Sequence, residues 1–192
     1  MPRPHWFPSV VLLIATVAAS WLGMMVVHES GHVLAAWLSG GRVAGVVLHP
    51  MAFSRTDVAE NPHPAFVTWA GLVWGMALPV AAWLVARAAR WKLAYLLRAF
   101  AGFCLIANGA YLASAIVAPV GDAQDLVRLG TPLWVMVPIG LAGVVGGLAT
   151  WNGLGSRFGI GREATVEREA MIAAGISLVM LVVGMLAWSA WA

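Results

Sequence analysis

Charge is scarce in this sequence. Only 11 lysines and arginines and 8 aspartates and glutamates occur among the 192 residues, and 61% of the residues are hydrophobic. A soluble domain carries about a quarter charged residues, which it needs to cover a surface that faces water. The composition therefore excludes an ordinary water-soluble domain and predicts a chain solvated by the lipid bilayer.

Disulfides and a basic surface are also missing. The single cysteine, Cys104, cannot form a disulfide within the chain. The formal net charge is only +3, and the basic residues are spread between apolar runs. Nucleic-acid-binding proteins present clustered basic residues, so nucleic acid is not an expected partner.

Uncharged apolar runs predict the fold class. A helix needs about 20 apolar residues to cross the hydrocarbon core of a bilayer. The first run continues through Leu38, because an apolar stretch resumes directly after its charged residues. We predict an all-α polytopic membrane protein, one domain over residues 1–192, with five transmembrane helices in the runs 9–27, 66–86, 99–121, 129–156 and 170–192.

Basic residues predict the orientation in the membrane. Cytoplasmic loops are enriched in lysine and arginine. Loops on the amino-terminal side of the five runs hold eight basic residues, and the other side holds three, Arg42, Arg55 and Arg128. We therefore expect a cytoplasmic amino terminus, with the eight basic residues Arg3, Arg87, Arg90, Lys92, Arg98, Arg157, Arg162 and Arg168 inside.

The first apolar run contains an HExxH motif, residues 28–32. His28 and His32 share one helical face at i and i+4, so both can bind one zinc ion. Glu29 is rotated by about 100° from His28, close enough to take a proton from water that attacks a carbonyl. Gly31 is expected to leave room for a substrate backbone. The alternative is a buried histidine–glutamate network without metal, but uncompensated ionisable groups are costly in hydrocarbon.

Two aspartates can supply a third ligand. Catalytic zinc usually has three protein ligands and one open position. Asp122 and Asp125 are the acidic residues that lie between the third and fourth transmembrane runs. The alternative is that both cap a helical turn at the membrane surface.

The sequence HESGHVLAAWLSGGRV, residues 28–43, resembles the signature of the site-2-protease family in its small bacterial branch. Trp69-Ala70-Gly71-Leu72 is similar to the family's Ala-Gly helix start, and Val120-Gly121-Asp122-Ala123 to its Gly/Asp segment. The resemblance covers about residues 20–135. It implies a multi-pass zinc metalloprotease of the bacterial inner or plasma membrane, which cleaves transmembrane protein substrates in or near their membrane segments.

The resemblance also implies residue roles. Asp122 is the third zinc ligand, and Asp125 stays the alternative because the family's Leu-Asp-Gly form is not kept. Asn108 corresponds to an asparagine that helps to hold substrate; the alternative is that Asn108 only packs helices together. Residues 39–65 form a membrane-associated β-hairpin that presents the substrate as a strand. Residues 9–130 are the catalytic core, and residues 131–192 are accessory helices.

Two expectations compete with this interpretation. A catalytically silent, metal-binding scaffold or regulatory subunit could keep the same fold, although such a protein would have no use for Glu29. The site-2-protease family also usually places its site near the cytoplasmic face. The basic residues of this chain predict the opposite face, because the motif lies near the far end of the first apolar run.

Overall fold

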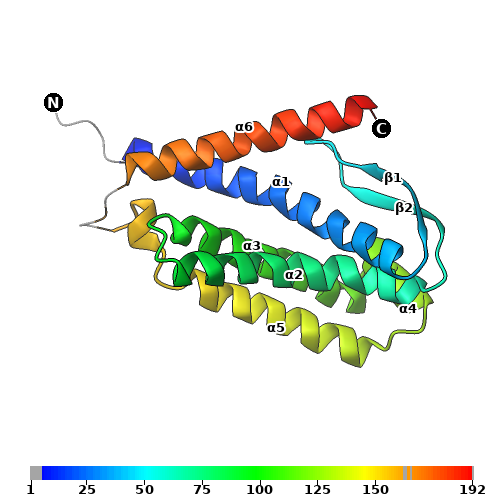
Figure 1. The fold of residues 1–192 in the computed structure, drawn as a ribbon. Helices are drawn as coiled ribbons and strands as arrows, with labels where there is room; N and C mark the ends of the chain where they lie inside the picture. Colours follow the sequence, from blue (N-terminus) through cyan, green and yellow to red (C-terminus); the bar gives the residue numbers. More distant parts are fainter. Residues whose placement is uncertain (1–5, 162–163, 165, 192) are drawn as a thin grey trace.

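A computed structural model describes residues 6–161, 164 and 166–191 of the protein. Arg3 and Arg162, two of the eight basic residues that predict the orientation, lie outside the described residues. Helices make up most of the fold (Figure 1). The elements, in chain order, are α1 (Trp6–Leu38), β1 (Arg42–Val47), β2 (Arg55–Glu60), α2 (Pro64–Ala88), α3 (Ala94–Ala113), the 3₁₀ helix η1 (Ser114–Ile116), α4 (Gly121–Arg128), α5 (Leu133–Trp151), the 3₁₀ helix η2 (Gly155–Phe158) and α6 (Arg168–Trp191).

Five helices of the described chain are long and apolar enough to cross a membrane: α1, α2, α3 with η1, α5 and α6. The prediction of a polytopic helical fold with five spans is confirmed, and these helices indicate a multi-pass integral membrane protein. The limits of the third span differ from the predicted 99–121. This helix begins at Ala94 and includes Arg98, whose guanidinium donates hydrogen bonds of 2.7 Å to the carbonyls of Thr150 and Asn152.

The third span also ends earlier than predicted, at Ile116. Pro119 follows, and a proline disfavours helical geometry for the residue before it. The chain then turns and forms the short helix α4, which sequence analysis did not predict. This break in the apolar run is what separates α4, and with it Asp122, from the spanning helix.

The helices form two groups (Figure 1). α1 and α6 run side by side in the same direction, α2 and α3 pack against α1, and α5 packs against α3. Small residues bring α3 and α5 close together: a Cβ on Gly109 would lie 2.6 Å from the carbonyl oxygen of Gly140. The hairpin and α4 lie at the end of the bundle where α1 ends, opposite the start of α1 (Figure 1).

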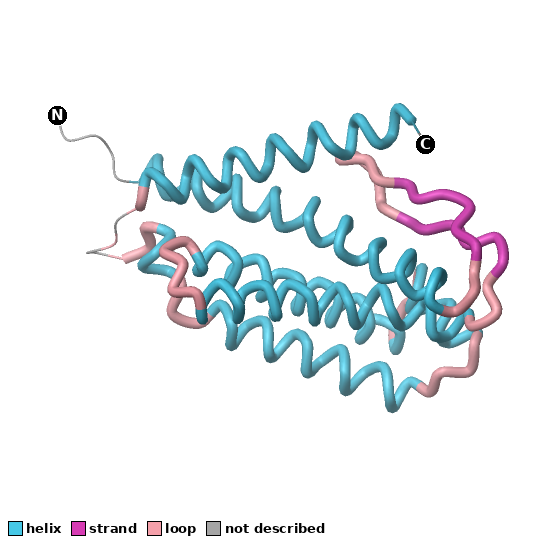
Figure 2. The backbone as a smooth tube through the Cα atoms, in the orientation of Figure 1, coloured by secondary structure: helices cyan, strands magenta, loops and turns pink. Residues whose placement is uncertain are grey.

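The two strands between α1 and α2 form an antiparallel hairpin (Figure 2). Arg42 pairs with Glu60 and Val46 with Thr56, with irregularities near Val43. Side chains alternate along β2, so Val58 packs toward the Ala35 end of α1. The hairpin predicted for residues 39–65 is confirmed.

A buried apolar cluster supports α4. Ala123 and Leu126 are three residues apart and face inward against Leu72, Leu112 and Met136 of the longer helices. This packing fixes the rotation of α4 about its own axis, and therefore decides which of its acidic side chains faces α1.

Candidate metal centre

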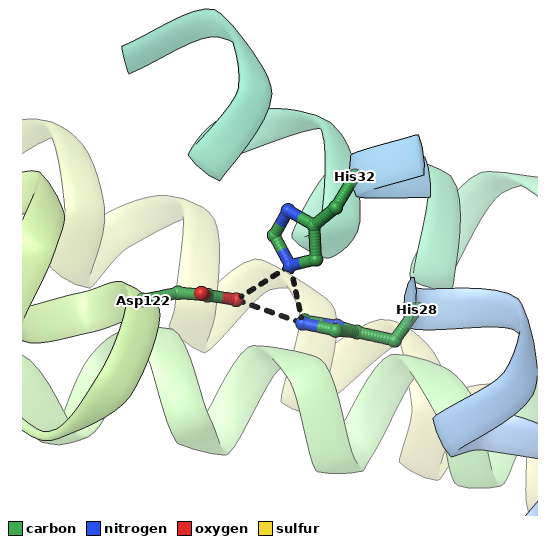
Figure 3. Close-up of side chains that lie close together, drawn as sticks. All are labelled: His28, His32 and Asp122. Atoms are coloured by element: carbon green, nitrogen blue, oxygen red, sulfur yellow. Dashed lines mark hydrogen bonds and ion pairs between the residues drawn. The ribbon is translucent and has the colours of Figure 1, made fainter. Parts of the chain in front are cut away.

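The last part of α1 carries the HExxH motif on a buried face. His28, Glu29 and His32 are 8%, 3% and 6% exposed. One helical turn separates the two histidines, and their ring centroids are 4.8 Å apart. Their Nε2 atoms lie 3.1 Å apart and point into the same space (Figure 3).

Asp122 reaches this space from the first turn of α4 (Figure 3). Its Oδ2 lies 2.7 Å from Nε2 of His28 and 3.2 Å from Nε2 of His32. Asp125 is exposed and pairs with Arg128 instead. The structure therefore brings Asp122, and not Asp125, to the two histidines; these three side chains are called the His-His-Asp cluster below.

Backbone geometry aims Asp122 at the histidines. Gly121 has a φ of +50°, a conformation that residues with a Cβ rarely adopt. The backbone N–H of Asp122 donates a 2.8 Å hydrogen bond to the Tyr111 hydroxyl, which occupies the position that a Cβ on Gly121 would take. Tyr111 and Gly121 together hold the first turn of α4 against α3.

The hydrogen bonds of the two Nδ1 atoms orient both imidazole rings and indicate that Nδ1 carries a hydrogen in each. The Asn108 amide nitrogen donates to the Cys104 carbonyl, which turns the Asn108 oxygen toward Nδ1 of His28 at 2.8 Å. Nδ1 of His32 lies 2.8 Å from the Val67 carbonyl oxygen. Both partners are acceptors, so each Nδ1 carries a hydrogen, and each Nε2 is the ring atom that can bind a metal ion.

The donor set of the cluster suits a zinc ion. Burial raises the pKa of Asp122, but hydrogen bonds with His28 and His32 outweigh burial and hold this pKa below its usual range. An ionised carboxylate oxygen and two imidazole nitrogens that point into the same space favour a shared cation. Tetrahedral zinc with bonds of about 2.0–2.2 Å separates its ligand atoms by about 3.3 Å. Two of the separations, 3.1 and 3.2 Å, are near this value, and the third, between His28 and Asp122, is shorter at 2.7 Å.

Glu29 lies next to the cluster on α1 and contacts the hairpin. Its Oε2 accepts a 2.7 Å hydrogen bond from the Thr56 hydroxyl of β2. Glu29 is not part of the His-His-Asp cluster, which consists of His28, His32 and Asp122. The spacing of the HExxH motif also gives Glu29 no role as a metal ligand. The carboxylate is therefore held beside the cluster by a different element of the fold.

The expectation for Gly31 is wrong. A Cβ at this position would lie 2.6 Å from the Ala70 carbonyl oxygen and 2.8 Å from Cβ of Trp74. The space beside Gly31 is thus filled by α2, and not left for a substrate. Gly71 on α2 also allows close packing, because the His32 ring occupies the space that a Cβ at position 71 would need.

Asn108 is 2% exposed and lies behind His28. Its amide contacts His28 and the Cys104 carbonyl, so its substrate-binding role stays a prediction. Sequence analysis missed Tyr111 and Thr56. Tyr111 is one of only two tyrosines and lies one turn from Asn108, which was an available signal. Thr56 gave none, because its contact depends on the hairpin register.

The family model described as Peptidase M50B-like matches residues 6–118, which include α1, the hairpin, α2 and α3. Asp122 lies beyond the matched residues, so its place in the cluster rests on geometry. No curated protein and no solved structure matches the chain. The family match covers more than half of the 192 residues and confirms the resemblance stated above. We conclude that the chain belongs to the Peptidase M50B-like family, a membership that implies a membrane metallopeptidase.

Proposed function

We propose that the chain is an intramembrane zinc endopeptidase that hydrolyses peptide bonds in or near transmembrane segments of other membrane proteins. The observation that carries this proposal is the His-His-Asp cluster, whose ligand atoms lie within 4.8 Å of one another beside Glu29. The match to Peptidase M50B-like proteins supports the reaction class. Five candidate spans support a substrate that is itself in the membrane.

His28, His32 and Asp122 would hold the zinc ion. Two imidazoles and one carboxylate would leave an open position of the kind that catalytic zinc sites keep. When bound, zinc supplies a Lewis acid that activates water and polarises the substrate carbonyl. Asn108 and the Val67 carbonyl act behind the ligands, because their hydrogen bonds orient the two imidazoles.

Glu29 is the general base. It follows His28 directly in α1 and is buried, which keeps bulk water from competing for its protons. Its carboxylate accepts a proton from the attacking water and then returns it to the amine that leaves. A buried carboxylate without such a task is unfavourable in a membrane helix, and this argues against a silent scaffold.

An apolar groove supports a substrate that arrives from the bilayer. The groove has a volume of about 460 Å³, lies between α1, α3 and α6, and extends along α1 to Val27, the residue before His28. Its α1 floor includes the small residues Ala19 and Gly23, which allow a helix to approach closely. Among the residues that the structure describes, no ionisable side chain lines the groove.

Reconstitution tests the proposal. The purified chain is placed in lipid vesicles with a set of single-span model proteins, and the products are mapped by mass spectrometry. We expect cleavage within or next to the membrane segment, which stops when a zinc chelator is added. The control substrates carry the same soluble sequence without a membrane segment and stay intact. Zinc-loaded protein that cleaves none of the set would favour the scaffold.

A further inference from the structure

A hairpin residue holds the Glu29 carboxylate. The Thr56 hydroxyl donates to Oε2 of Glu29 at 2.7 Å. Among the residues that the structure describes, this is the one hydrogen-bond partner of the carboxylate. A contact between β2 and α1 across 27 positions of sequence is not required by the HExxH spacing. It therefore needs its own explanation.

The pleat of β2 determines that Thr56 faces α1. Arg55 and Asp57 point outward and pair with each other at 3.2 Å. Thr56 and Val58 take the opposite face, where Val58 packs against the cluster around Ala35. A slip of one residue in the hairpin would turn Thr56 outward and replace it with a charged side chain.

Helix α6 contacts the hairpin at the residue that pairs with Thr56. Val46 is the cross-strand partner of Thr56. The Val46 carbonyl accepts a 2.7 Å hydrogen bond from the Trp188 indole N–H, near the end of α6. Figure 1 shows this end of α6 beside the hairpin. The contacts therefore run from α6 through one cross-strand pair to Glu29.

We propose that Thr56 is a positioning residue for Glu29, and that Trp188 keeps Thr56 in place by anchoring the hairpin to α6. This inference rests on the proposed function, in which Glu29 moves protons. Because the Thr56 hydroxyl engages Oε2, Oε1 is the oxygen that receives the proton from water. A hairpin that is displaced from α6 loses this orientation, so the seating of the hairpin controls the activity of the base.

Kinetics of matched variants test the positioning role. Thr56→Val keeps the shape of the side chain but removes the hydroxyl, and we expect kcat to fall by roughly tenfold to a hundredfold, the size typical of a lost hydrogen bond to a charged group. KM and zinc content stay unchanged. Thr56→Ser keeps the hydroxyl and restores most of kcat. Thr68→Val on α2 removes a hydroxyl that donates only to the Pro64 carbonyl of its own helix; this variant is the control and has wild-type kcat.

The anchor is tested in the same assay. Trp188→Phe removes the indole N–H and should lower kcat by roughly threefold to tenfold, less than Thr56→Val because β-pairing still holds the hairpin in part. The double variant should lose no more than Thr56→Val alone, because both changes act on one interaction. Trp191→Phe is the matched control, since this indole is 93% exposed.

Hydrogen exchange gives a readout that does not depend on cleavage. Backbone amides of residues 55–60 should exchange roughly fivefold faster in Thr56→Val and in Trp188→Phe, but not in Trp191→Phe. Absence of cleavage by the wild type would overturn the proposed function. Unchanged exchange in both variants would overturn the anchor, and full kcat of Thr56→Val in an active protein would overturn the positioning role.

Discussion

Oδ2 of Asp122 lies 2.7 Å from Nε2 of His28, although 94 positions separate the two residues in the sequence. This contact joins α4 to α1 and completes the His-His-Asp cluster. It depends on Gly121, on the Tyr111 hydroxyl and on the buried face of α4. The proposed zinc site is therefore a tertiary arrangement, to which the HExxH helix contributes only two of three ligands.

The histidines determine the metal content. Purified wild type should carry about one zinc ion per chain, and His28→Ala and His32→Ala should each lose it, because two remaining ligands bind zinc weakly. Metal analysis after dialysis against a weak chelator measures this. Full zinc occupancy in the double histidine variant would contradict the assignment.

The two aspartates should behave differently. Asp122→Ala removes a ligand and should lower zinc affinity by at least a hundredfold, by analogy with the large effects of ligand loss. Asp125→Ala should retain zinc and most of the activity, because Asp125 pairs with Arg128 on the exposed side of α4. Zinc titration of both variants measures the difference, and the reverse ranking would make Asp125 the third ligand.

A substitution of Asn108 distinguishes between two roles for this residue, positioning His28 and binding substrate. Asn108→Ala removes the acceptor behind His28 and should lower zinc affinity by about 10–100-fold, the usual cost of losing such a partner. At saturating zinc, KM should stay near the wild-type value. If KM rises while zinc affinity is unchanged, Asn108 binds substrate as the family resemblance implies.

The spanning helices were predictable because apolar length alone defines them. His28 and His32 were predictable because both lie on one helix, where spacing fixes their relative position. The choice of Asp122 over Asp125 rested on the family resemblance alone, because the two are three residues apart and the packing of Ala123 and Leu126 decides which faces α1. The same limit applies to Thr56, whose direction depends on strand register.

Orientation is a separate prediction. Most basic residues of the described chain, among them Arg87, Arg90 and Lys92, lie at the end of the bundle opposite the hairpin, whereas Arg42, Arg55 and Arg128 lie at the hairpin end. A reporter active only in the cytoplasm should therefore be active when fused after Lys92 and silent when fused after Asp125. The opposite pattern would place the His-His-Asp cluster near the cytoplasmic face, as is usual in the site-2-protease family.

The central claim is that Glu29 moves protons at a zinc site. Glu29→Gln keeps the size of the side chain and an oxygen that can accept the Thr56 hydrogen bond, but it cannot take a proton at neutral pH. The decisive measurement is kcat of Glu29→Gln in vesicles, with zinc content determined on the same sample. We predict full zinc content, intact insertion and a loss of about 10²–10⁴-fold in kcat. Wild-type kcat in a zinc-loaded Glu29→Gln variant would contradict the account.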